Sequence, residues 1–176
     1  MHPLLQQLTG GDRRSIGQSE KVAAAVLADP TLFSIVFEGI LVDDPLVRMR
    51  CADVVEKVTE PHPEWLLPHK KMLLRQVAKI EQQEVRWHAA QLFSRLPLTK
   101  AERGAVVKIL NTYLADKSGI VRTFAMQGLA DMAERDERLR APVSAQLEEL
   151  TRTGTPAMQS RGRKLLVKLK KGGRAR

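Results

Sequence analysis

The chain has 176 residues, of which 43% are hydrophobic, 28% are charged and only 4% are aromatic. This composition excludes disorder of the whole chain, and its many helix-forming residues together with its few aromatic ones favour an all-α fold. The formal net charge is +9, and all of the excess lies in residues 152–176, which hold nine Lys and Arg side chains and no acidic one. An acidic partner for this tail and a merely solvated basic end both fit the asymmetry.

Local signals predict helices, in chain order, at residues 19–28, 30–42, 45–59, 63–80, 99–115, 119–134, 138–152 and 156–171. Asp29, Asp44 and Thr155 each precede a proline, and a capping side chain followed by proline is typical of a helix start. Thr99 with Glu102 has the spacing of a capping box, in which the two side chains satisfy each other's backbone N–H groups.

One phrase recurs along the chain, with Val47, Val85, Val121 and Met158 as its reference positions at intervals of 36 to 38 residues. Four residues after each reference stands a small residue, and apolar residues follow at the seventh and eighth positions. These offsets describe one helix face, so EVRWHAAQLF at residues 84–93 is also expected to be helical. The small residues are Cys51, Ala89, Ala125 and Gly162, and they should let two helices approach closely.

A second apolar set recurs in the segments between these phrases, at a spacing of 37 residues. Its members are Val36, Leu73, Leu110 and Leu147. Each unit therefore contains two helices, and stacking such pairs would bury a continuous core.

Four segments resemble the repeats of the HEAT-repeat family: PLVRMRCADVV, EVRWHAAQLF, GIVRTFAMQGL and PAMQSRGRKLL. The chain is also similar to small bacterial HEAT-repeat proteins. The resemblance implies a right-handed α-solenoid of about four helix pairs. Residues 1–28 would form a degenerate N-terminal cap, residues 29–171 the repeat domain and residues 172–176 a basic, flexible C-terminus. The resemblance also implies a ladder of ion pairs, in which the arginines one residue after the reference positions bind Asp44 and Asp116. The alternative is that these arginines form a stripe that faces a ligand.

In a HEAT-like solenoid the inner helices line a concave groove, and a helical projection places offsets 2, 6 and 9 opposite the core. The candidate residues for binding a protein partner are Met49, Asp53, Trp87, Gln91, Thr123 and Gln127. Trp87 is either an exposed anchor for a partner or a side chain folded over the next repeat; the sequence leaves both open.

Catalytic and metal-binding patterns are not found in the sequence. The four histidines include no pair four residues apart, no C-x-x-C accompanies Cys51, and no nucleophile elbow or phosphate loop occurs. We therefore expect no catalytic residue, metal or cofactor. The chain also lacks a signal-peptide pattern and a transmembrane apolar run, so a cytoplasmic protein without a membrane partner is expected. The sequence leaves the oligomeric state open, but a capped solenoid can be monomeric, and we expect a monomer.

The leading hypothesis is a non-enzymatic adaptor that presents its groove to a protein partner. The alternative is nucleic-acid binding through the basic tail and the groove arginines, whose candidate residues are Arg48, Arg86, Arg122, Arg161, Lys164 and Lys168. A DNA-glycosylase-like enzyme ranks third, because Gln91 rather than a carboxylate stands four residues after Trp87.

Overall fold

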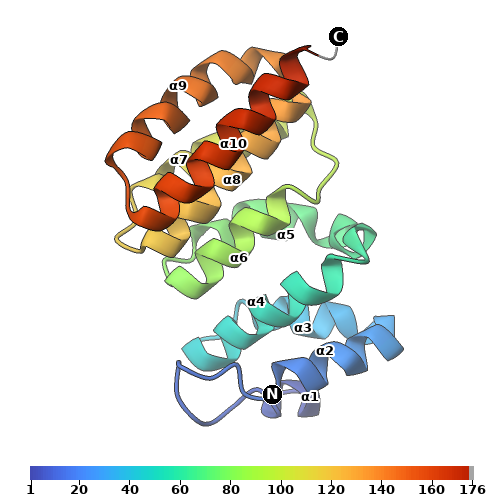
Figure 1. Ribbon diagram of the computed structural model, residues 1–176. Helices are drawn as coiled ribbons and strands as arrows, with labels where there is room; N and C mark the ends of the chain where they lie inside the picture. Colours follow the sequence, from blue (N-terminus) through green and yellow to red (C-terminus); the bar gives the residue numbers. More distant parts are fainter. Residues whose placement is uncertain (175–176) are drawn as a thin grey trace. The chain divides into compact units, whose positions relative to one another are not determined.

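The structure is a computed structural model that describes residues 1–174. Over this range the chain is all-helical, with ten α-helices, three short 3₁₀ helices and no strand (Figure 1). None of the described helices is both long and apolar enough to cross a membrane. The chain divides into two compact units, Met1–Leu96 and Pro97–Arg176, and each is described by itself.

Helix α4 is the centre of the first unit, where it packs against α2, α3 and α6. Its N-terminus is capped by Asp44, whose carboxylate accepts from the backbone N–H of Leu46 at 2.8 Å and of Val47 at 3.3 Å. The α-helices of this unit are α1 (Pro3–Gln6), α2 (Ser19–Ala28), α3 (Phe33–Gly39), α4 (Pro45–Thr59), α5 (Lys70–Arg75) and α6 (Gln83–Phe93). The 3₁₀ helices are η1 (Pro30–Leu32), η2 (Pro63–His69) and η3 (Val77–Lys79).

The predictions for residues 19–28 and 45–59 match α2 and α4 at both ends. The single helix predicted at residues 63–80 is wrong, because the segment is broken into η2, α5 and η3. Pro68 provides a physical reason for the break, since it lies inside the segment and has no N–H group to donate within an α-helix.

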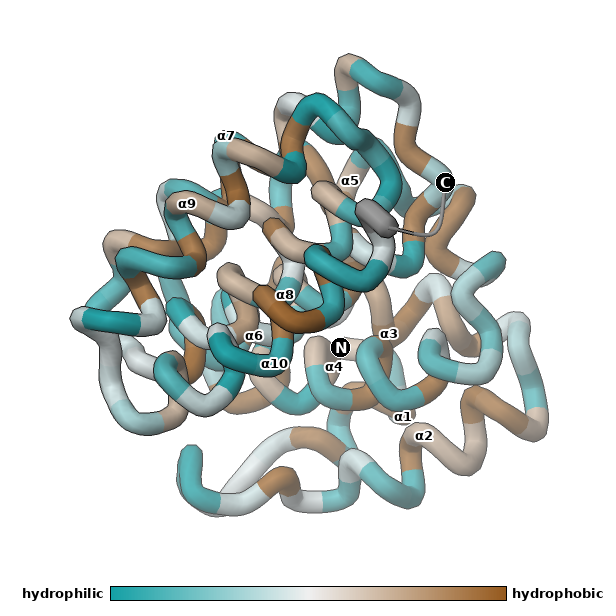
Figure 2. Tube along the Cα trace, turned by 45° about the horizontal axis from the view of Figure 1, so that its top comes forward, coloured by the Kyte–Doolittle hydropathy of each residue, from teal (hydrophilic) through white to brown (hydrophobic). Residues whose placement is uncertain are grey.

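The second unit consists of α7 (Lys100–Leu114), α8 (Gly119–Arg135), α9 (Glu137–Thr153) and α10 (Pro156–Arg174). Helix α8 packs against α7, α9 and α10, and α9 also packs against α10. The predicted capping box at the start of α7 is confirmed, with N–H···O distances of 2.8 and 3.2 Å between Thr99 and Glu102. Figure 2 shows hydrophobic and hydrophilic segments alternating along α9, as expected for a helix with one buried face.

Helix α10 extends to Arg174, three residues beyond its predicted end at residue 171. The predicted flexible C-terminus at residues 172–176 therefore begins inside a helix, and its residues 175–176 lie outside the described residues. The predicted repeat domain at residues 29–171 spans both units, so a single solenoid stays a prediction.

The column of small residues is buried, as its predicted role requires. A Cβ atom on Gly162 would lie 1.9 Å from Oγ1 of Thr151 on α9 and 3.1 Å from Cε of Met126 on α8. In the first unit, a Cβ atom on Gly39 of α3 would lie 2.5 Å from Sγ of Cys51 on α4. These helices approach so closely that a larger side chain would force them apart.

Candidate ligand-binding pocket

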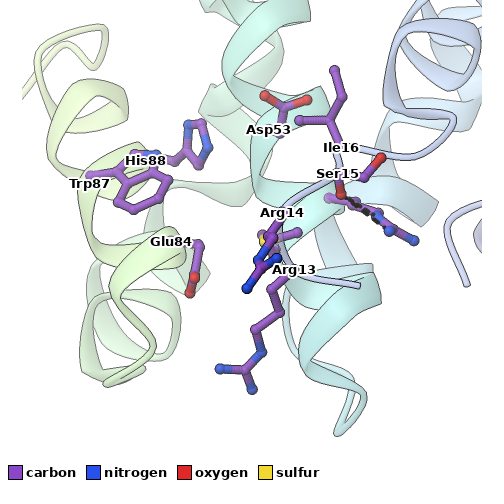
Figure 3. A pocket seen from close by; sticks show the side chains of 10 residues that line it. Arg13, Arg14, Ser15, Ile16, Asp53, Glu84, Trp87 and His88 are labelled. Atoms are coloured by element: carbon purple, nitrogen blue, oxygen red, sulfur yellow. Dashed lines mark hydrogen bonds between the residues drawn. The ribbon is translucent and has the colours of Figure 1, made fainter. Parts of the chain in front are cut away.

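The first unit contains a pocket of about 230 Å³. Three segments enclose it: residues 13–16 of the loop between α1 and α2, one turn of α4 and one turn of α6 (Figure 3). We refer to it below as the α4–α6 pocket.

The loop that forms one wall of the pocket is held in place by Arg50 of α4, which is only 1% exposed. The Arg50 guanidinium donates to the carbonyl oxygens of Leu8 and Gly10 at 2.7 Å, of Asp12 at 3.2 Å, and of Ser15 at 3.1 and 3.2 Å. All of these acceptors are backbone carbonyls. A buried cation that is satisfied in this way orders the loop by binding its backbone.

Glycines allow the loop to wrap this guanidinium. Gly10, Gly11 and Gly17 have φ angles of +74°, +78° and +57°, which other residues rarely adopt. A Cβ atom on Gly17 would lie 2.8 Å from Cζ of Arg50. Sequence reasoning missed this role of Arg50. The signal was a charged residue on an otherwise apolar face of the helix predicted at residues 45–59.

Helix α6 supplies two buried polar side chains to the opposite wall, Glu84 and His88, which lie one turn apart and are 6% and 8% exposed. Oε2 of Glu84 and Nδ1 of His88 are both buried without a hydrogen-bond partner. The other Glu84 oxygen, Oε1, accepts from Nε2 of Gln83 at 3.4 Å. A buried polar atom without a partner costs about 1–3 kcal/mol, so a ligand that supplied partners here would recover part of that energy.

The His88 imidazole is neutral at pH 7 because its pKa is lowered to about 4. Burial is the largest cause, and it outweighs the nearby Asp53 carboxylate, which acts in the opposite direction. A neutral imidazole has one nitrogen that donates and one that accepts a hydrogen bond.

Trp87 is half-buried and lies between Glu84 and His88 in the sequence of α6, with its ring 5.6 Å from that of His88. Figure 3 shows these three side chains on one side of the pocket, with Asp53 of α4 and the loop residues Arg14, Ser15 and Ile16 across from them. Asp53 is held in place by Lys57, whose Nζ lies 2.9 Å from Oδ2 of the carboxylate.

The structure brings together three of the predicted partner-binding residues: Met49, Asp53 and Trp87 all line the pocket. The expected exposure of Met49 and Thr123 is wrong, since they are 7% and 9% exposed. The helical projection predicts exposure from one isolated helix and ignores its neighbours. In the structure the N-terminal loop covers α4 at Met49, and three helices pack against α8, which carries Thr123.

The remaining predicted residues do not line this pocket. Gln91 is half-buried, and its Nε2 donates to the carbonyl oxygen of Trp87 at 3.3 Å. Gln127 belongs to the second unit, where it binds Asp131 and Arg161 at 2.9 Å each.

The predicted aspartate ladder is wrong for Arg48. Its guanidinium donates to the carbonyl oxygen of Val42 at 2.9 and 3.1 Å, while Asp44 caps α4. Nε of Arg86 donates to the carbonyl oxygen of Ile80 at 3.2 Å, and the ladder stays a prediction for this residue. In both cases the arginine binds a carbonyl six residues earlier, where a preceding helical segment ends and leaves carbonyls without helical partners.

The basic residues of the second unit are partly engaged by α8. Arg161 of α10 donates to Oε1 of Gln127 at 2.9 Å and lies over the ring of Phe124, 5.6 Å from its centre. Lys168 pairs with Glu134 at 2.8 Å and lies 3.9 Å from Asp131. Lys164 is exposed, and Nε of Arg122 is buried without a hydrogen-bond partner.

The second unit has a further hollow of about 450 Å³ at the start of α8. Its lining includes Ile120, Thr123 and Phe124 and no charged side chain. This hollow has no unpartnered polar atom that would indicate a ligand.

Two findings bear on chemistry. Among residues 1–174, no three His, Cys, Asp or Glu side chains are grouped so that they could hold a metal ion. The argument against an enzyme from Gln91 was incomplete, because Asp53 and Glu84 stand in the same pocket as Trp87. Asp53 lies on another helix and Glu84 precedes Trp87, so a search along one ridge of one helix did not find them.

Comparison of the chain with protein-family models, with curated proteins and with solved structures finds no match. Functional inference therefore depends on the geometry of the site.

Proposed function

We propose that the chain is a non-enzymatic module that binds a protein partner through the α4–α6 pocket, as part of a HEAT-like solenoid of about four helix pairs. One observation carries the proposal: the half-exposed Trp87 stands beside two buried polar atoms, on Glu84 and His88, that have no partner in the chain. Tryptophan is enriched among residues that dominate binding energy at protein interfaces.

The size of the pocket favours one side chain of a macromolecule over a free metabolite. Small-molecule sites enclose about 300–1,000 Å³, whereas this pocket encloses about 230 Å³. A partner would place one residue in the pocket and make its other contacts around the mouth, where Arg13 and Arg14 are exposed.

Nucleic-acid binding is the second candidate, and it is favoured by the same two exposed arginines and by the exposed basic residues of α10. Two of the tail residues proposed for this role, Arg161 and Lys168, are already engaged by side chains of α8. Their release would cost part of the electrostatic gain from phosphate binding. The protein partner therefore ranks first.

Affinity capture with the immobilised full-length chain, from cell extract with and without nuclease, tests the proposal. We expect a polypeptide that is retained after nuclease treatment by the wild type and lost by Trp87→Ala. Gln91→Ala is the matched control, because Gln91 lies one turn further along α6 and does not line the pocket. Capture that requires intact nucleic acid, or that is equal for wild type and Trp87→Ala, would contradict the proposal.

A further inference from the structure

We infer that the α4–α6 pocket receives an arginine side chain from a segment of the partner in which acidic residues flank that arginine. This inference rests on the proposed function and names the chemistry that the site would recognise. It follows from the acceptors inside the pocket, the indole beside them and the cations at the mouth.

The interior of the pocket offers acceptors that require a donor. Oε2 of Glu84 is buried without a hydrogen-bond partner, which is costly for a carboxylate oxygen. Nδ1 of His88, one turn away, is also buried without a partner, and it accepts a hydrogen bond in the tautomer that carries its proton on Nε2. The Asp53 carboxylate also lines the pocket, where its Oδ2 is paired with Nζ of Lys57 at 2.9 Å. A ligand group with several N–H donors and a positive charge would satisfy these atoms, and guanidinium has five such donors in one plane.

Trp87 supplies a surface for the same group. A guanidinium is attracted to the face of an indole ring and stacks on it more readily than an ammonium does. Because Trp87 is only half-buried and its ring contacts only the tilted His88 ring among the described aromatic side chains, an incoming planar cation can approach it.

The mouth of the pocket carries the opposite charge to its interior. Arg13 and Arg14 line it and are exposed, and neither guanidinium has a carboxylate partner among the described residues; the Arg14 backbone N–H donates to Oδ1 of Asp12 at 2.8 Å. These two cations would repel an isolated basic residue. Acidic residues next to the inserted arginine would convert that repulsion into attraction, so charge complementarity selects a segment of mixed charge.

A displayed library of random linear peptides, selected on the full-length chain, tests this inference. Peptides are retained for scoring only when Trp87→Ala fails to bind them, and their sequences are compared. We expect an arginine with Asp or Glu at neighbouring positions to dominate the retained set. Selection on Glu84→Gln, which keeps the side-chain shape and the acceptor for Gln83 but removes the charge, should not enrich it.

Isothermal titration with one retained synthetic peptide then measures each contact. Replacing its arginine by citrulline, which has nearly the same shape and no charge, should weaken binding about tenfold or more, which corresponds to about 1.4 kcal/mol. Replacing it by lysine should have a smaller effect. The double variant Arg13→Glu/Arg14→Glu should lose affinity for the acidic-flanked peptide and recover it when the flanking acids become lysines. Thermal unfolding of each variant confirms that it is folded.

The outcomes separate the two proposals. Trp87-dependent peptides without a basic residue, or with one whose replacement by citrulline has no effect, would overturn the arginine inference and leave the protein-binding function standing. If no peptide depends on Trp87 for binding, and the wild-type chain captures no polypeptide after nuclease treatment, both the arginine inference and the protein-binding function would be overturned. Binding of oligonucleotides that depends on Trp87 and Arg14 would replace both with a nucleic-acid site.

Discussion

Removing the donors of Arg50 should open the loop that forms one wall of the α4–α6 pocket. In Arg50→Met the apolar length of the side chain is retained, but the carbonyls of Leu8, Gly10, Asp12 and Ser15 lose their common partner. Hydrogen bonds to a charged group contribute about 1.5–3 kcal/mol each, but they are not additive.

Two features of the structure limit the cost. Gly10, Asp12 and Ser15 are exposed, so their carbonyls can bind water once the loop opens, whereas Leu8 is fully buried. The released loop also regains backbone entropy. We therefore expect the free energy of unfolding to fall by about 2–4 kcal/mol, which is the range for losing one strong network rather than the sum of its bonds.

Urea denaturation measures this loss, and hydrogen exchange by mass spectrometry locates it. Exchange at residues 9–18 should accelerate strongly in Arg50→Met, while exchange in the middle of α4 should change much less. Arg48→Met is the matched control, since Arg48 lies on the same helix and also binds a carbonyl, that of Val42. Equal protection of residues 9–18 in wild type and Arg50→Met would refute the role of Arg50 as the anchor of the loop.

Three further perturbations follow from the structure. Gly17→Ala should destabilise the protein more than Gly10→Ala in thermal unfolding, because both glycines have positive φ but only the Gly17 Cβ would collide with Arg50; equal losses would contradict this contact. Gly162→Ala should lower the free energy of unfolding by about 1–3 kcal/mol, because the new Cβ would collide with Thr151. Gly104→Ala in α7, where the new Cβ meets open space, should leave the free energy of unfolding unchanged or raise it by up to about 1 kcal/mol. Similar changes for both variants in urea denaturation would refute the close approach of α9 and α10. The His88 pKa is about 4 in the folded protein and 6.5 in the unfolded chain, so between these pH values the unfolded chain binds the extra proton. The free energy of unfolding should therefore fall as pH decreases from 6.5 to 4, by roughly 3 kcal/mol at most. His88→Gln should reduce this acid sensitivity, and an unchanged pH profile would contradict the lowered pKa.

The sequence predicted those parts of the fold that depend on local patterns. The ends of α2 and α4 and the capping box of α7 were predicted from residues a few positions apart, because caps and prolines act within one turn. The recurring small residues also predicted the close helix contacts at Cys51 and Gly162, since the steric requirement repeats with the period.

The pocket could be predicted only in part, because it is made by segments that are distant in sequence. Trp87 and Asp53 were found as members of a helix face. The role of Arg50 depends on a loop some 40 residues away, and Glu84 is important because Oε2 has no partner after folding. Neither property is encoded in a local pattern.

The central claim is that a polypeptide binds at the α4–α6 pocket, and titration of ¹⁵N-labelled full-length protein with the captured, nuclease-treated partner tests it most directly. The two indole N–H signals report on two places in the first unit: Trp87 lines the pocket, whereas Trp65 packs on Phe33 and His62 and does not line it. We predict that the Trp87 signal shifts saturably with added partner while the Trp65 signal stays nearly fixed. A partner that binds without changing the Trp87 signal would contradict the claim.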